Sequence, residues 1–102
     1  MYLQKFKKGI LLSKKTSVNL ELGLVKCKKN QLTALGLHDD EEEAYIILKG
    51  KGLLSLGKEK KTVKAGCVIY VPMKVQHQFK ALTNDFEYIY AATWPKKKSN
   101  RK

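Results

Sequence analysis

Hydrophobic and polar residues alternate along most of this chain in short runs, and turn residues separate one run from the next. Residues 75–81 alternate most clearly, with one face that is apolar except for a histidine and one face that is polar. No helical periodicity of any length is present. Short strands about ten residues apart are typical of a β-sandwich or barrel, so the pattern predicts an all-β domain. The expected strands cover residues 18–24, 43–49, 53–56, 62–64, 67–71, 75–81 and 86–93.

The length of 102 residues predicts one domain, which we expect to span residues 1–95. A basic, disordered tail is expected at residues 96–102, after Pro95. The first residues lack the apolar core and cleavage site of a signal peptide, and no apolar run reaches the roughly 18 residues of a membrane span. Cys27 and Cys67 are too few for a disulfide framework, which favours a cytoplasmic protein with reduced thiols.

The net charge of +12 is unevenly distributed. Residues 1–30 carry eight lysines and one acid, residues 31–95 carry eight of each, and residues 96–102 carry five basic groups. The basic ends lack the interleaved aromatic residues of a single-strand binding surface. A lysine-rich soluble surface therefore explains the charge better than nucleic-acid binding, which stays as the lesser alternative.

Two ionisable residues fall on apolar faces. Glu43 closes an acidic run and begins an apolar strand, where it shares a face with Tyr45 and Ile47. His77 shares a face with Phe79. Because burial of an unpaired carboxylate is costly, Glu43 needs a partner: a metal, a histidine or a substrate group. A hydrogen bond between Glu43 and His77 is one of the open alternatives.

Residues 36–50 resemble the first motif of the cupin family, His-x-His-x(3,4)-Glu-x(6)-Gly. In this motif His38 takes the second histidine, Glu43 the glutamate and Gly50 the glycine. The first histidine is replaced by Gly36.

Residues 66–81 are similar to the second cupin motif, Gly-x(5)-Pro-x-Gly-x(2)-His-x(3)-Asn. The first glycine, the proline and the histidine are kept as Gly66, Pro72 and His77. Two positions depart from the motif, with Lys74 for the second glycine and Ala81 for the asparagine. The resemblance spans about residues 18–94 and implies a small cupin barrel, that is, a double-stranded β-helix or jelly roll.

The resemblance also implies a metal site. His38, Glu43 and His77 would form a two-histidine, one-carboxylate set for a divalent transition metal such as Fe, Mn, Ni or Zn. With one ligand missing, a pocket without metal stays equally open. Gly36 lies two residues before His38, so its Cβ position should point at the same site and a histidine there should complete the set.

Four aromatic residues are expected to line a small-molecule pocket, with packing in the core as the alternative: Tyr45, Tyr70, Phe79 and Tyr90. Two functions remain open. The first is a metal-dependent enzyme acting on a small polar molecule, in which the ion polarises a substrate oxygen. The second is a metal-free cupin with a ligand-binding or structural role. We also expect a homodimer with contacts from residues 2–12.

Overall fold

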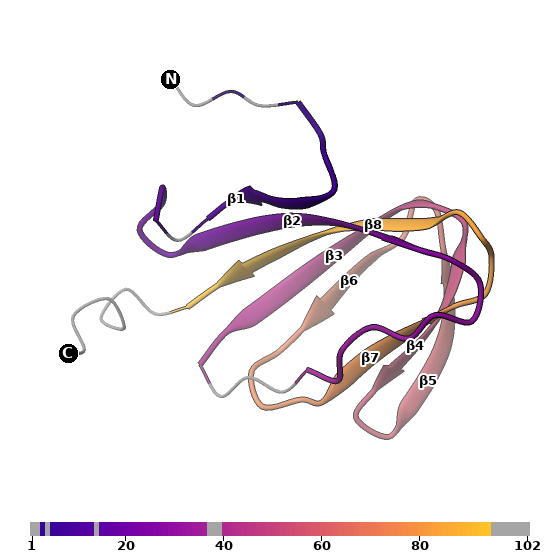
Figure 1. Cartoon of the computed structure of the whole chain (residues 1–102). Coiled ribbons are helices and arrows are strands. Elements are labelled where there is room, and N and C mark those ends of the chain that lie inside the picture. The colour runs from indigo at the N-terminus through magenta and orange to yellow at the C-terminus, as the bar shows by residue number, and fades with distance from the viewer. Residues whose placement is uncertain (1–2, 4, 14, 37–39, 95–102) are drawn as a thin grey trace.

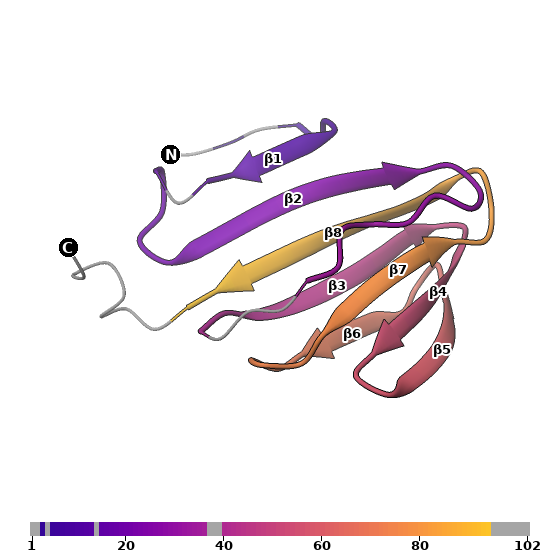
Figure 2. The ribbon, with the colours of Figure 1, turned by 60° about the horizontal axis from the view of Figure 1, so that its bottom comes forward.

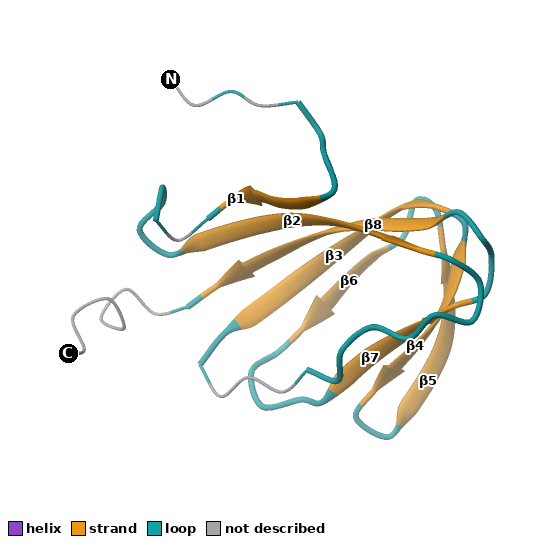
Figure 3. Cartoon of the chain, in the orientation of Figure 1, coloured by secondary structure: helices purple, strands orange, loops and turns teal. Residues whose placement is uncertain are grey.

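A computed structural model of the chain describes residues 3, 5–13, 15–36 and 40–94. Within these residues, all regular secondary structure is β-strand (Figure 3), so the all-β prediction is confirmed. The strands are β1 (Gly9–Leu12), β2 (Leu20–Cys27), β3 (Glu42–Lys49), β4 (Lys51–Leu56), β5 (Glu59–Lys64), β6 (Val68–Val71), β7 (His77–Ala81) and β8 (Phe86–Thr93).

The strands form two antiparallel sheets, as the jelly-roll prediction requires (Figure 1). The larger sheet has the order β1-β2-β8-β3-β6 and the smaller sheet the order β5-β4-β7. Strands adjacent in a sheet are therefore often distant in the sequence, as for β3, which lies between β8 and β6. Strand β3 is apolar on both faces over most of its length, but only one face is buried: Ile47 is 1% exposed and Ile46 is 43% exposed.

The strands found by alternation agree with the structure, and two differences are informative. Strand β1 was not predicted, because four residues at a sheet edge carry too little pattern and depend on pairing with β2. Strand β2 was expected at residues 18–24 but runs from Leu20 to Cys27. Its leucine-rich face points away from the interior. The opposite face, which carries Gly23 and Val25, points inward, because Gly23 pairs with Tyr90 and Val25 with Tyr88.

The core has an apolar end and a polar end. The apolar end is where Ile47, Phe79 and Phe86 are fully buried between the two sheets. The rings of Phe79, Phe86, Tyr45 and Tyr88 form a connected aromatic cluster; the centroids of Phe79 and Tyr88, for example, are 4.8 Å apart. At the polar end Glu43 and His77 occupy inward positions.

Residues 31–36 extend the smaller sheet beyond β7. The Thr33 amide donates to the Phe79 carbonyl at 3.0 Å, and Gly36 and His77 exchange two backbone hydrogen bonds of 2.9 and 3.0 Å. Figure 2 shows this segment passing between β2 and β7 before the chain enters β3. One edge of the barrel interior is therefore closed by a short irregular segment and not by a full strand.

Three predictions fall partly or wholly outside the described residues: the site residue His38, the tail at 96–102 and part of the dimer contact at 2–12. The homodimer and the cytoplasmic location stay predictions. Within the described residues, no helix is long and apolar enough to pass through a membrane.

Candidate functional site

Glu43 begins the polar end of the interior. It is the second residue of β3, where it pairs with Val71 on one side and Ala92 on the other. Its side chain is about 10% exposed. The hydroxyl of Tyr45, two residues further along the same face, donates a 2.8 Å hydrogen bond to Glu43 Oε1. Strand alternation thus places an acid and its first hydrogen-bond donor side by side.

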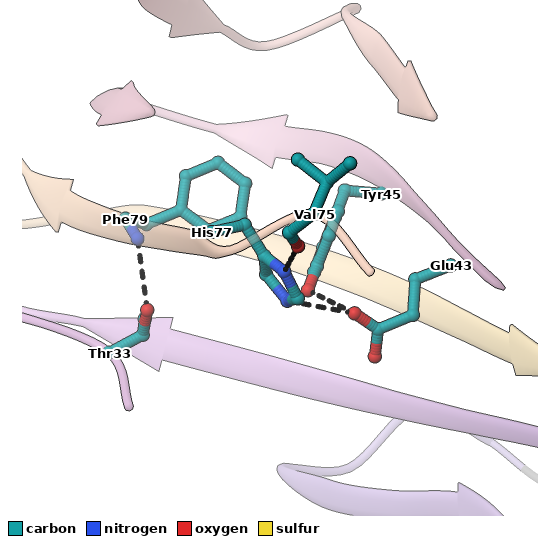
Figure 4. A network of polar contacts seen from close by, with 6 residues as sticks. All are labelled: Thr33, Glu43, Tyr45, Val75, His77 and Phe79. Atoms are coloured by element: carbon teal, nitrogen blue, oxygen red, sulfur yellow. Dashed lines mark hydrogen bonds and ion pairs between the residues drawn. The ribbon is translucent and has the colours of Figure 1, made fainter. Parts of the chain in front are cut away.

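His77 supplies the second partner of this carboxylate. Its Nε2 lies 2.9 Å from Glu43 Oε1, and its Nδ1 lies 3.2 Å from the Val75 carbonyl oxygen (Figure 4). Both neighbours are acceptors, so the geometry favours an imidazolium with a proton on each nitrogen. The hydrogen bond to Glu43 raises the pKa of His77, against the opposing effect of burial. Glu43 and His77 therefore form an ion pair, which is one of the alternatives left open by the sequence.

Gly36 lies against the imidazole of His77. A Cβ atom built on Gly36 would be 2.6 Å from His77 Nε2 and 2.7 Å from Cε1. The side-chain direction at position 36 thus points at the site, as the sequence predicts. The His77 ring, however, already fills the space that a side chain at position 36 would need.

The described residues fit a metal only in part. Glu43 and His77 are suitable donors and converge, but His38 lies outside the described residues. Among the residues that are described, no three His, Cys, Asp or Glu side chains gather in a way that could hold a metal. Metal binding would require His77 Nε2 to lose its proton and turn from Glu43 to the ion. The divalent-metal hypothesis stays a prediction.

A cavity of about 510 Å³ opens beside this pair, between β2 and residues 31–36. This volume is within the range of pockets for small organic molecules. Its described lining comprises Val25, Cys27, Gln31, Leu32, Thr33, Ala34, Leu35, Gly36, Glu43, Tyr45, His77, Tyr88 and Tyr90.

The four aromatic residues predicted for the pocket divide into three groups. Tyr45 and Tyr90 line the cavity. Phe79 belongs to the core beneath it and packs edge-on against Tyr45, with 4.9 Å between ring centroids. Tyr70 corrects the prediction: it is 56% exposed on the outer face, where its hydroxyl donates to Glu42. The reason is register, since Tyr70 pairs with Ala44 on the face opposite to Glu43.

Sequence reasoning missed the inward face of β2. The Tyr90 hydroxyl donates a 2.8 Å hydrogen bond to Glu21 Oε2. The Tyr90 ring reaches Glu21 by lying across Gly23, where a Cβ atom would be 2.2 Å from the ring. A glycine inside an apolar strand is a known signal of such close approach. Tyr88, which also lines the cavity, was not singled out either.

The comparisons with known proteins agree with this architecture. The family described as "Cupin domain" matches residues 23–90. An uncharacterized protein from Methanocaldococcus jannaschii is 40% identical over 63 residues, 62% of this chain and 50% of that protein. One from Streptomyces coelicolor is 29% identical over 55 residues, 54% of this chain and 52% of that protein. The chain therefore spans about half the length of these curated relatives.

Among solved structures, a predicted oxalate decarboxylase from Thermotoga maritima has a TM-score of 0.78 at 24% identity. The alignment covers 84% of this chain and 77% of that one. At this identity the likeness concerns the fold.

Proposed function

Because the chain belongs to the cupin family, as the match over residues 23–90 shows, we propose that it binds a small organic molecule in the interior cavity. The Glu43–His77 pair is the polar anchor of this site. The chain spans only about half the length of its curated relatives, so the proposal concerns this domain and not the activity of a whole relative.

The observation that carries the proposal is the position of the ion pair. Glu43 Oε1 and His77 Nε2, 2.9 Å apart, both belong to residues that line the cavity of about 510 Å³. A charged pair at the wall of a largely apolar pocket is the usual arrangement of a ligand site, in which few polar groups fix orientation.

A divalent metal site is the second candidate. It is supported by the donor types of Glu43 and His77, a carboxylate and an imidazole that converge at the cavity. A bound ion would polarise an oxygen atom of the ligand. The chain's own residues would hold and orient that ligand, with Tyr45 fixing the Glu43 carboxylate.

Titration calorimetry with manganese, nickel and zinc separates the two candidates. Gly36→His should raise metal affinity about tenfold or more if His77 can turn to make room, since one more ligand is added. Equal and negligible heats for the wild type and the variant would end the metal candidate and leave the organic ligand.

The proposed function itself is tested with a library of small amines, acids and alcohols, oxalate included, by NMR of the amide groups. Compounds that bind should shift the amide signals of Leu35, Tyr45 and Tyr90. Glu43→Gln should lower the binding affinity of these compounds severalfold. Glu42→Gln is the matched control, because its carboxylate faces outward and bonds Tyr70. The proposal fails if no compound shifts these signals, or if Glu42→Gln weakens binding as much as Glu43→Gln.

A further inference from the structure

We propose that the molecule held in the cavity is a small organic cation, an amine or guanidinium that carries an apolar group. This inference rests on the proposed small-molecule function and names its substrate class. It comes from the charges, the hydrogen-bond protons and the aromatic rings that surround the cavity.

The cavity wall does not share the positive charge of the chain: its described charged residues are one carboxylate, Glu43, and one imidazolium, His77. The protein has 21 lysines and arginines, yet none of them is among the described residues that line the cavity. His77, the cationic group among the described lining residues, is bonded to Glu43 and Val75. Among the described lining residues, an anionic ligand would therefore find no cation that is not already committed to another acceptor.

Carboxylates instead surround the Tyr90 side of the cavity. Glu21 accepts the Tyr90 proton, and burial together with Glu21, Glu43 and Glu41 raises the pKa of the Tyr90 hydroxyl. Glu21, which bonds the Tyr90 hydroxyl directly, thus places a carboxylate beside the cavity wall at a point where a cationic ligand can approach it. At the other end of the cavity, burial raises the pKa of the Cys27 thiol and the positive charge of Lys8 partly opposes this effect. This lysine charge is therefore near Cys27 and not near Tyr90.

The hydroxyl protons of Tyr45 and Tyr90 define the hydrogen bonds that a ligand can make with these two groups. Tyr45 donates its proton to Glu43 and Tyr90 donates to Glu21, each at 2.8 Å. Both hydroxyl oxygens keep lone pairs and can still accept. A ligand that reaches them must therefore donate protons, as an ammonium or guanidinium group does.

Aromatic rings provide the third feature. Tyr45, Tyr88 and Tyr90 line the cavity, and the rings of Tyr45 and Tyr88 stand edge to face with centroids 5.4 Å apart. The face of a tyrosine ring attracts a cation within about 6 Å of its centroid. Val25 and Leu35 supply apolar wall for the rest of the ligand.

The test uses three probes of the same shape and different charge: benzylamine, benzyl alcohol and benzoate. Binding is followed by NMR of the amide signals of Leu35, Tyr45 and Tyr90 at low salt. Benzylamine should bind about tenfold more tightly than benzoate, which corresponds to about 1.4 kcal/mol and is within the combined range of charge and cation–π effects.

Glu21→Gln keeps an acceptor for Tyr90 but removes the charge, so it should reduce the preference for benzylamine at least threefold. Glu87→Gln is the matched control, because Glu87 makes its ion pair with Lys49 on the opposite face of β8. The same change in net charge there should leave the preference unaltered.

The outcomes separate this inference from the function on which it rests. Benzoate binding as tightly as benzylamine in the same cavity would overturn the cation assignment and leave the small-molecule site standing. An equal loss of preference in Glu21→Gln and Glu87→Gln would also overturn it, since it would show a general effect of net charge. If none of the three probes shifts the cavity signals at millimolar concentration, both the inference and the proposed site fail.

Discussion

Two glycines lie beneath aromatic rings at opposite ends of the barrel interior. A Cβ atom on Gly52 would be 2.4 Å from the ring of Phe86, and one on Gly23 would be 2.2 Å from the ring of Tyr90. In both cases the absence of a side chain lets a ring from β8 come close to the backbone of another strand.

The surroundings of the two rings differ. Phe86 is 0% exposed within the aromatic cluster, and Gly52 approaches it from the smaller sheet. Tyr90 is half-buried at the cavity, and Gly23 lies beside it in the same sheet. The first contact holds the two sheets together, whereas the second aims a hydroxyl at Glu21. Close packing therefore serves stability at one end and the geometry of a site at the other.

Gly52→Ala should have the largest effect on stability. The added methyl has no room because neither Phe86 nor the strands around it can move, so we expect a loss of about 3 kcal/mol. Chemical denaturation of the variant measures this loss. A loss below about 1 kcal/mol would show that the apolar end is not closely packed.

Gly23→Ala should cost less, about 1 kcal/mol, because the Tyr90 ring can move into the cavity. The displaced ring would lose Glu21, so binding in the cavity should fall together with the modest loss of stability. A double-mutant cycle with Tyr90→Ala tests the cause: once the ring is gone, the alanine at position 23 should cost almost nothing. Additive losses would contradict the assignment of this clash to Tyr90.

The Glu43–His77 pair should make stability depend on pH. Since the pKa of His77 is raised in the folded protein, its contribution is fully present below the unfolded value of about 6.5 and is lost as pH rises through the folded pKa. A charged hydrogen bond of this kind contributes about 1–3 kcal/mol. The difference in unfolding free energy between wild type and Glu43→Gln should therefore be largest below about pH 6.5 and should shrink as the pH rises through the raised pKa of His77. Parallel curves for the two proteins would rule out this contribution.

Lys74→Gly should give the smallest change, a gain of about 0.5 kcal/mol. Lys74 has a φ of 68°, in the left-handed region where the second cupin motif has glycine. Asn30, with a φ of 72°, is the matched control, because asparagine tolerates this conformation and Asn30→Gly should gain less. Equal gains at both positions would mean that the lysine is not strained.

Much of the fold was predictable because strand alternation records which face is inside. The predicted strand at 86–93 matches β8 at both ends. Glu43 and His77, which are distant in the sequence, were both predicted to face the interior, and the structure places them in one site. Their mutual bond was one of several alternatives, since partners across sheets are decided by tertiary packing and not by local pattern.

The errors concern the choice between two faces of similar hydrophobicity. Tyr70 was assigned inward, although its neighbour Val71 pairs with Glu43 and leaves Tyr70 outside. In β2 the leucines attracted attention, while Glu21 and Gly23 carry the inner face. Where both faces of a strand are apolar, the sequence does not show which face points inward. Only the register of strand pairing decides this, because a shift of one residue exchanges the two faces.

The titration of the His77 imidazole, followed by NMR, tests the central claim most directly. The chain has only two histidines, so His38→Gln leaves the signal of His77 alone. We expect His77 to titrate above the ordinary value of about 6.5, with both ring nitrogens protonated below its pKa, and to return toward that value in Glu43→Gln. A His77 that titrates at or below the ordinary value in the wild type, with Nε2 unprotonated at neutral pH, would contradict the ion pair on which the site is built.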